Sequence, residues 1–373
     1  MRNRWIAWMG AAGIALALLF VTALPVAGQA AKSAIPRMPD GHPDLQGTYD
    51  LATMTPFERL GGDPPSYTKE KAEALMKAEI ARRAVDNKPS SADRPAPPVG
   101  GDTTPPKSFF ETLEKLGGGP VGGYNRFWLD QGASFTVVDG QIRTSIVVDP
   151  PDGHVPPYNA AARKRFSTPQ RVTTPTSDER ENANPNATEA AGALDDPERR
   201  PLGERCLLGF GSTSGPPALP DYFYNDLHQI VQTPDSIMIL TEMVHDARIV
   251  RMNAQHLPKA IRRWMGDSVG HWEGDTLVVD TTNFNDKTRF RNATENLHVI
   301  ERFTRVDDKT LLYRFTIEDP ETWDRPWSGE YTWPVTDKKI YEYACHEGNY
   351  ALGDILRGAR KQEAEEAAAR TKK

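Results

Sequence analysis

The sequence predicts a mainly β fold, in which an antiparallel meander forms a barrel or a strongly bent sheet with a few peripheral helices. Three observations predict it. Short segments of strand-forming residues follow one another between residues 134 and 346, separated by turn pairs such as Asp139-Gly140 and Pro234-Asp235. No helical segment separates them, so the connections are hairpins and a parallel sheet is excluded. No repeat of fixed length is visible, which argues against a propeller.

The expected strands come in pairs, and each pair flanks one turn. In chain order the pairs are Ser134–Val138 with Gln141–Val148, His228–Thr233 with Ser236–Val244, Val269–Trp272 with Thr276–Thr281, Val299–Val306 with Thr310–Ile317, and Gly329–Val335 with Lys339–Ala344. An earlier segment, Gly47-Thr48-Tyr49, resembles the opening strand motif of lipocalins. That resemblance implies a lipocalin-like barrel.

Two helices are expected at the edges of this β region. Thr68 is a helix-capping residue type, and the apolar residues of Lys69–Val85 recur at helical spacing. The segment Ile355–Lys373 is rich in Lys, Arg, Glu and Ala, which indicates a solvated surface helix.

The apolar residues favour one main core with long appendages. Phe166–Pro201 and Asn87–Lys107 are rich in Pro and polar residues and hold too little apolar surface to order themselves. The expected divisions are a signal peptide at 1–30, an N-terminal part of the β domain with a helical insertion at 31–160, a low-complexity linker or loop at 161–201, the main antiparallel region at 202–354 and a charged C-terminal helix at 355–373.

The first residues are typical of a secretory signal peptide. Arg2 and Arg4 precede the apolar run Ile6–Val26, which ends in small residues around Ala30. The alternative is an uncleaved anchor, because about 20 apolar residues can span a bilayer. No cysteine follows the expected cleavage site, so a lipoprotein is disfavoured. We expect a periplasmic or secreted protein without a stable membrane anchor after cleavage.

The charge of the exported part disfavours a nucleic-acid partner. Removing Arg2 and Arg4 leaves 43 basic against 51 acidic residues, a net charge of about −8. Nucleic-acid binding requires a clustered positive surface. The glycine-rich phosphate and dinucleotide loops and the serine-hydrolase elbow are also missing from the sequence. A small molecule remains the expected partner, no organic cofactor is predicted, and the oligomeric state stays open.

The two cysteines, Cys206 and Cys345, both lie in the exported part. In an oxidising compartment they predict one disulfide that ties a mid-chain loop to the last strand. The alternative is a free Cys345 with His346 as its base. Neighbouring residues of a strand point to opposite faces, which places that pair poorly for proton transfer.

Several segments together resemble a family of exported proteins of environmental bacteria without an assigned activity. They are Tyr124–Trp128, Arg143–Ser145, Asp149–Gly153, His245–Arg248, Met265–Phe284, Glu295–His298, Glu301–Phe303 and Tyr343–Tyr350. The resemblance covers most of Leu45–Gly358 and implies export and one shared architecture. It implies no catalytic residue.

Two glutamates stand among apolar residues of expected strands. Glu242 follows Met238 and Leu240 in alternation, and Glu301 lies between Val299 and Phe303. Burial raises the pKa of a carboxylate and so tunes it as a general acid or base. The alternative is a buried ion pair with an arginine of a neighbouring strand, such as Arg248, Arg302 or Arg314.

The motif His245-Asp246-Ala247-Arg248 directly follows the strand of Glu242. Strand ends that enter loops often display catalytic groups. His245 is then a base, Asp246 its orienting partner and Arg248 a clamp for an anionic or carbonyl oxygen. The alternative is a structural turn in which Asp246 binds backbone N–H groups and Arg248 pairs with a carboxylate.

Further binding residues are expected around these groups. The substrate-binding candidates are Tyr124, Trp128, Arg143, His298 and His346. A metal is not predicted, because no local metal-binding motif is present. If one is bound, His245, His298 and His346 are its candidate ligands. Aromatic residues gather near turns and strand ends, where they either wall a ligand pocket or pack in the core.

Two functions follow from this set of residues. The first is an exported enzyme that performs acid–base chemistry of lyase, isomerase or hydrolase type on a small organic molecule. Its catalytic residues would be Glu242, His245, Asp246, Arg248 and Glu301. The alternative is a periplasmic protein that binds a small ligand without catalysis.

Overall fold

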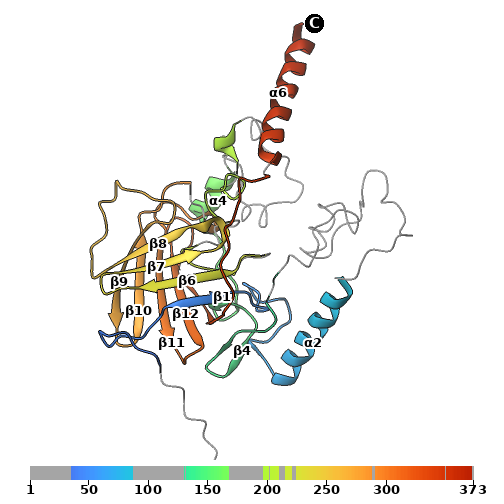
Figure 1. Cartoon of the computed structure of the whole chain (residues 1–373). Helices are drawn as coiled ribbons and strands as arrows, with labels where there is room; N and C mark the ends of the chain where they lie inside the picture. Colours follow the sequence, from blue (N-terminus) through green and yellow to red (C-terminus); the bar gives the residue numbers. More distant parts are fainter. Residues whose placement is uncertain are drawn as a thin grey trace, which may run out of the picture. The chain divides into compact units, whose positions relative to one another are not determined.

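A ten-stranded, strongly curled sheet forms a half-barrel in the order β1-β6-β7-β8-β9-β10-β11-β12-β13-β5 (Figure 1). The structure is a computed structural model that describes residues 35–86, 130, 132–167, 196–200, 202–209, 215–220, 224–287, 290–348 and 350–371. A small second sheet has the order β2-β4-β3. The predicted mainly β fold with a strongly bent sheet is confirmed.

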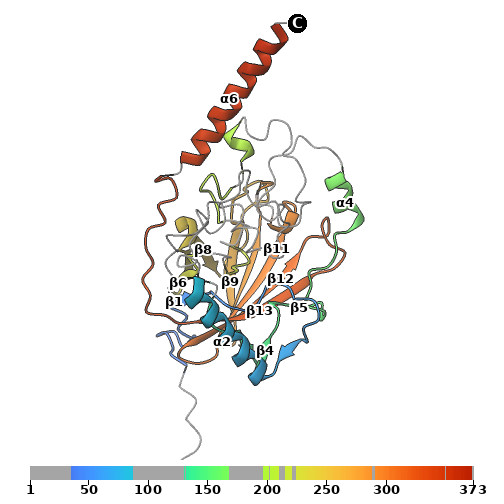
Figure 2. The ribbon, with the colours of Figure 1, turned by 90° about the vertical axis from the view of Figure 1, so that its right-hand side faces the viewer.

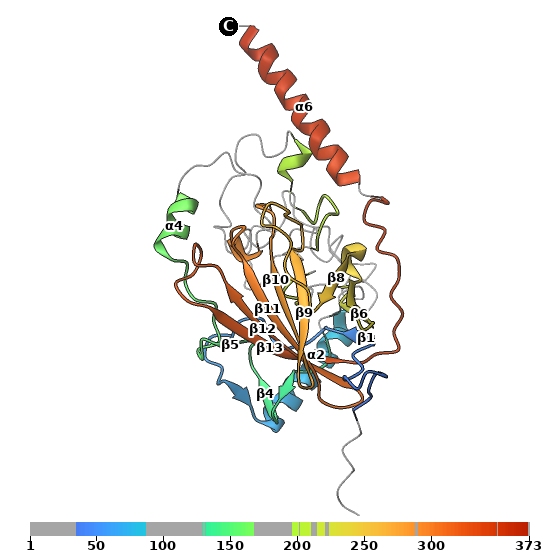
Figure 3. The ribbon, with the colours of Figure 1, turned by 90° about the vertical axis from the view of Figure 1, so that its left-hand side faces the viewer.

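The half-barrel strands are β1 (Gly47–Asp50), β5 (Val147–Asp149), β6 (Leu227–Gln232), β7 (Ser236–Thr241), β8 (Ala247–Met252), β9 (Asp267–Glu273), β10 (Thr276–Thr282), β11 (His298–Arg305), β12 (Thr310–Glu318) and β13 (Trp327–Pro334). Figure 3 shows β9 to β13 side by side. The small sheet consists of β2 (Ser66–Tyr67), β3 (Val137–Val138) and β4 (Gln141–Arg143). Short helical turns are η3 (Pro197–Arg199), η5 (Met243–His245) and η6 (Phe290–Asn292).

One strand pair corrects the prediction that excluded parallel pairing. Strands β8 and β9 are parallel, with Val250 opposite Ser268. Parallel neighbours need a crossover of about a dozen residues or more, and residues 253–266, hereafter the crossover, supply it without a helix. The crossover therefore lies beside the sheet at the β8–β9 pair.

The segment after β13 also differs from expectation. Val335 bridges Tyr49 of β1, and the Thr336 N–H donates to the Thr48 carbonyl at 2.9 Å, so the chain leaving β13 contacts the edge strand β1. The strand predicted at Lys339–Ala344 is absent. Its residues are largely exposed, so they bury too little surface to favour a further strand.

The concave face of the sheet holds the core. Along β11 and β12 the odd-numbered residues are buried, and aromatic rings dominate the filling, as with Tyr313 and Trp333 at 4.7 Å between ring centres. The buried residues 215–219 enter the same interior, where the Ala218 N–H donates to the Tyr313 hydroxyl at 3.0 Å. Trp323 and Trp327 are also buried. These aromatic residues therefore pack in the core, which was the expected alternative to lining a ligand pocket.

In the described part of the chain, three helices lie outside the sheet. They are α2 (Lys69–Asp86), α4 (Ala160–Ser167) and α6 (Tyr350–Thr371). The expected cap of α2 is confirmed, because the Lys71 N–H donates to the Thr68 hydroxyl at 3.3 Å. Figure 2 shows α2 beside β4. The expected C-terminal helix is present as α6, whose residues are mostly exposed.

Several expectations fall on residues outside the described part. The predicted signal peptide, residues 87–129 and residues 168–195 belong there. Helix α4 occupies the start of the stretch predicted as a linker. The domain divisions therefore stay predictions. No described helix has the length and apolar character of a membrane span.

The predicted disulfide between Cys206 and Cys345 is present, and their Cα atoms lie 5.9 Å apart. It joins positions separated by 139 residues. Cys345 lies in a turn rather than on the expected last strand. Because the thiol is bonded, the alternative of a Cys345 nucleophile is excluded. A disulfide is consistent with an oxidising compartment, and the periplasmic or secreted location stays a prediction.

Candidate functional site

A buried ion pair crosses the interior of the half-barrel. Arg248 of β8 and Glu301 of β11 have side chains 5% and 0% exposed. The Arg248 Nη2 donates to Glu301 Oε1 at 2.9 Å, and Nη1 donates to Oε2. Strands β9 and β10 separate the two in the sheet, so the strong curl is what brings them together.

Further groups complete the surroundings of this pair. The Tyr313 hydroxyl donates to Glu301 Oε1 at 2.8 Å, and burial first, then the Glu301 charge, raises the pKa of Tyr313 well above its ordinary value. Tyr313 therefore remains a donor. Three hydrogen bonds, two of them from a guanidinium cation, engage both oxygens of Glu301, so the carboxylate is held as an ion-pair partner and is poorly suited to act as a general base. Glu301 is therefore part of a buried ion pair with Arg248, which was the expected alternative to a general acid or base.

A cavity of about 560 Å³ lies between the start of β8 and the end of the crossover. Cys206 and Leu207 form a third side of it, which the disulfide holds to the C-terminal segment. The residues around it are Cys206, Leu207, Val244, Asp246, Ala247, Arg248, Ile249, Arg262, Arg263, Trp264, Met265 and Gly266. The predicted His-Asp-Ala-Arg motif therefore contributes directly to a cavity.

Three of the four charged residues around this cavity are arginines. Its charged residues are Arg248, Arg262, Arg263 and Asp246. Arg262 donates to the Phe284 and Glu295 carbonyls at 3.2 and 2.6 Å, and its guanidinium forms an ion pair with the Glu295 carboxylate at 3.7 Å. Arg263 is exposed, and its guanidinium makes no hydrogen bond or ion pair with any residue in the described part of the chain. The Arg263 guanidinium is thus available to a ligand.

The backbone before the motif is unusual. Val244 in η5 has φ 65° and ψ 5°, a left-handed conformation that a β-branched residue rarely adopts. It places the half-buried Asp246 at the cavity, where the Asp246 carbonyl accepts from the Thr241 N–H at 2.9 Å. The side chain of His245 lies outside the described part. Its role as a base stays a prediction.

Glu242 is positioned differently from expectation. Strand β7 ends at Thr241, and its buried face carries odd-numbered residues, so Glu242 does not continue an apolar face with Met238 and Leu240. It is 5% exposed, and its carboxylate accepts from the Tyr341 N–H at 3.2 Å. Burial raises the pKa of Glu242 in spite of these hydrogen bonds. Glu242 is not among the cavity residues.

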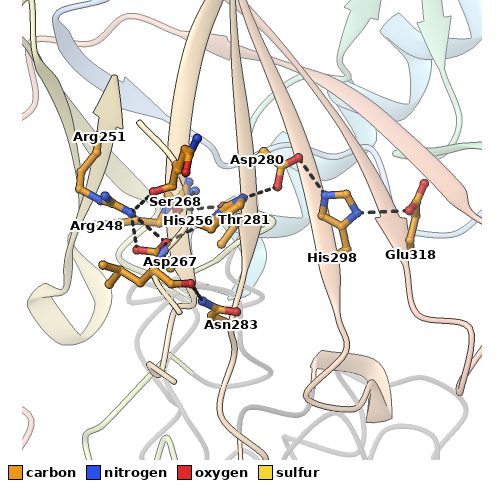
Figure 4. A network of polar contacts seen from close by, with 12 residues as sticks. Arg248, Arg251, His256, Asp267, Ser268, Asp280, Thr281, Asn283, His298 and Glu318 are labelled. Atoms are coloured by element: carbon orange, nitrogen blue, oxygen red, sulfur yellow. Dashed lines mark hydrogen bonds and ion pairs between the residues drawn. The ribbon is translucent and has the colours of Figure 1, made fainter. Parts of the chain in front are cut away.

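A second polar network crosses the outer face of the sheet (Figure 4). It alternates basic and acidic side chains over strands β8 to β12 in the order Arg251, Asp267, His256, Asp280, His298 and Glu318. His256, from the crossover, lies 3.2 Å from Asp267 Oδ2 through Nδ1 and 3.0 Å from Asp280 Oδ1 through Nε2. This network, hereafter the outer network, fastens the crossover to the sheet.

His298 has the same kind of surroundings as His256. Its Nε2 lies 3.0 Å from Asp280 and its Nδ1 lies 3.2 Å from Glu318. A neutral imidazole has only one N–H, so two carboxylate neighbours favour the charged ring. The hydrogen bond to Asp280 is the main cause that raises the pKa of His298. Burial raises the pKa of Asp280, but His298 and His256 outweigh it and lower that pKa below its ordinary value.

Most of this network was not predicted from the sequence. His256 and Asp280 were not among the predicted site residues. One signal was present, because the hairpin around Asp307 places His298 directly opposite Glu318. The contact with His256 has no such signal, since it depends on the path of the crossover.

The outer network predicts a dependence of stability on pH. The contribution of His298 to the free energy of unfolding is complete below the pKa of about 6.5 that its ring has in the unfolded chain. This contribution is lost as the pH rises through the raised pKa of His298 in the folded protein. The wild-type protein is expected to lose thermal stability as the pH rises from about 6 to about 9. His298→Gln is expected to be less stable by about 1 kcal/mol near pH 6 and to lack this pH-dependent loss.

The measurement is thermal unfolding over that pH range. The matched control is His271→Gln, which removes an exposed histidine of β9 that faces Glu273 at 3.3 Å. Identical pH profiles for wild type and His298→Gln would contradict the stabilising role of the charged ring.

The remaining predicted residues do not gather at the cavity. Arg143 of β4 donates to the carboxylate of Glu330. His346 is exposed beside the disulfide, and His298 belongs to the outer network. Tyr124 and Trp128 lie outside the described residues. Within the ranges described above, no cluster of three or more His, Cys, Asp or Glu residues is arranged to hold a metal ion.

In comparisons with known proteins, no family model, no curated protein and no solved structure matches the chain. The resemblance to an exported bacterial family therefore stays an expectation from its motifs.

Proposed function

We propose that the protein binds a small organic anion in the cavity between β8 and the end of the crossover. The observation that carries this proposal is the excess of arginine there, with Arg263 uncommitted to any described residue. Guanidinium groups bind carboxylate and phosphate oxygens through paired, charge-assisted hydrogen bonds. An anion would pair with the exposed Arg263 guanidinium, while the Arg248 guanidinium stays paired with Glu301.

The other cavity residues suit an organic ligand. Leu207 and Met265 are apolar, and Trp264 contributes an aromatic ring. A volume of about 560 Å³ falls in the range of roughly 300–1,000 Å³ that is usual for small-molecule sites. A mostly apolar lining with a few convergent charges is also typical of such sites.

Binding without catalysis is the better-supported of the two functions that the sequence leaves open. Glu301 is engaged by Arg248 and Tyr313, and Glu242 lies away from the cavity. Two of the expected acid–base groups therefore have structural partners instead of a substrate. Arg248 borders the cavity, and its guanidinium is held by its carboxylate partner Glu301.

Substitution of Arg263 tests the proposal. Isothermal titration with benzoate and phenyl phosphate is expected to show binding that Arg263→Ala weakens by about tenfold or more, because a hydrogen bond to a charged group contributes about 1.5–3 kcal/mol. The matched control is Arg357→Ala, which removes an exposed arginine of α6. Equal affinity of Arg263→Ala and wild type for both anions would refute the site.

Turnover is the second candidate, and the backbone at Val244 favours it. Left-handed conformations of β-branched residues recur where a functional group must be held in place. Here the strained residue precedes His245-Asp246 at the cavity. If the anion is converted, Asp246→Asn is expected to abolish turnover while binding persists. Loss of binding together with turnover would instead indicate that Asp246 only shapes the cavity.

A further inference from the structure

An exposed apolar strip covers the outer face of β6, β7 and β8. On these strands the inner face carries the core residues, so their alternate residues point outward. The outward residues include Val231, Met238, Leu240 and Ile249. Val231 and Ile249 are 38% and 49% exposed, and the other two are half-buried. These four residues are hereafter the apolar strip.

Strand register makes the strip continuous. Val231 lies opposite Met238, and Met238 lies opposite Ile249, so the three form one row across three strands. Leu240 lies opposite Ala247 in the next row. With about 4.8 Å between neighbouring strands, the row from Ile249 to Val231 extends about 10 Å.

The strip leads directly into the cavity. Ile249 and Ala247, which begin the two rows on β8, are themselves cavity residues. The arginines of the cavity therefore stand at one end of a continuous apolar surface. In Figure 1 no described helix lies over the visible face of β6 to β8.

We infer that the ligand is an amphiphile, whose anionic head binds among the cavity arginines and whose unbranched apolar chain lies along Ile249, Met238 and Val231. This inference rests on the proposed function and names its ligand class. Charge complementarity orients the head, because the positive residues lie in the cavity and the strip carries no charged side chain. Burial of both apolar surfaces stabilises the bound chain.

A series of straight-chain carboxylates tests the inference. Acetate, butyrate, hexanoate, octanoate and decanoate are titrated below their aggregation concentrations. Each methylene that is buried on the strip is expected to strengthen binding about threefold, since it removes apolar surface from water. The affinity is expected to level off once the chain is longer than the row.

Substitutions on the strip give the second measurement. Met238→Ser is expected to weaken decanoate binding at least about fivefold and to leave butyrate binding unchanged. The matched control is Val306→Ser, at a residue after β11 that is 44% exposed and lies outside the strip. Decanol serves as the probe that lacks the anionic head, and it is expected to bind weakly.

The outcomes separate the inference from the proposed function. If benzoate binds but affinity for the carboxylates does not depend on chain length, the amphiphile inference is wrong and the anion site stands. If neither benzoate nor the carboxylates bind, both are wrong. Decanol binding as tightly as decanoate would overturn the role of the arginines. The chain-length series uses wild-type protein, so it tests the amphiphile inference even if a variant fails to fold.

Discussion

Replacing Glu301 by alanine is expected to lower the free energy of unfolding by about 3–5 kcal/mol. The substitution leaves the Arg248 guanidinium buried without its carboxylate, and it removes the acceptor of the Tyr313 hydroxyl. An unpaired buried charge costs far more than the ion pair contributes, because its hydration is not replaced. Chemical denaturation followed by circular dichroism measures the effect.

A double replacement distinguishes the effect on stability of removing one partner from the effect of removing the whole ion pair. Arg248→Met with Glu301→Leu is expected to be more stable than Glu301→Ala, since neither charge then remains buried. Glu363→Ala is the control, because it removes an exposed partner of Arg360 on α6. An effect of Glu301→Ala as small as that of the control would contradict the buried pair.

Removing the disulfide is the second change with a large expected effect. Cys206→Ser with Cys345→Ser is expected to lower the free energy of unfolding by about 5 kcal/mol, because the bond closes a long loop in the unfolded chain. The separation of 139 residues places it among the long loops. Denaturant unfolding of the double variant against wild type measures this cost.

The same bond holds one side of the cavity. Cys206 and Leu207 are cavity residues, so the double variant is also expected to bind benzoate more weakly than wild type. Thiol counting on denatured, unreduced wild-type protein provides the control. Two free thiols, or a double variant as stable as wild type, would contradict the assignment.

Much of the fold was predictable because its turns are local. Asp139-Gly140, Pro234-Asp235 and the turn around Asp307 each specify a hairpin through residues that favour tight turns. Their strands follow with the expected order and pairing. The cap of α2 is equally local, since Thr68 acts three residues along the chain.

The parallel pair and the end of β13 were not predictable in this way. No local sequence signal in the crossover indicates that it passes beside the sheet and that β9 then runs parallel to β8. The segment after β13 follows a turn signal at Asp337, but it has no core left to cover, and it lies against Glu242 instead. Tertiary packing overrides the local preference there.

The candidate site was partly predictable. The motif from His245 to Arg248 was predicted as a site because it follows a strand end, and Asp246, Ala247 and Arg248 border the cavity. Its partners come from distant positions, since Glu301 reaches Arg248 only through the curl of the sheet and Arg263 only through the crossover. Glu242 was predicted on a strand face, but β7 ends at Thr241 and Glu242 already has a helical backbone conformation.

A crystal structure of the protein with octanoate tests the central claim most directly. The carboxylate is predicted to lie in the cavity within hydrogen-bond distance of the Arg263 guanidinium, with its chain leaving past Ile249 toward Met238. Octanoate bound elsewhere, with the cavity free of ligand density at saturating concentration, would contradict the claim that these arginines form an anion site.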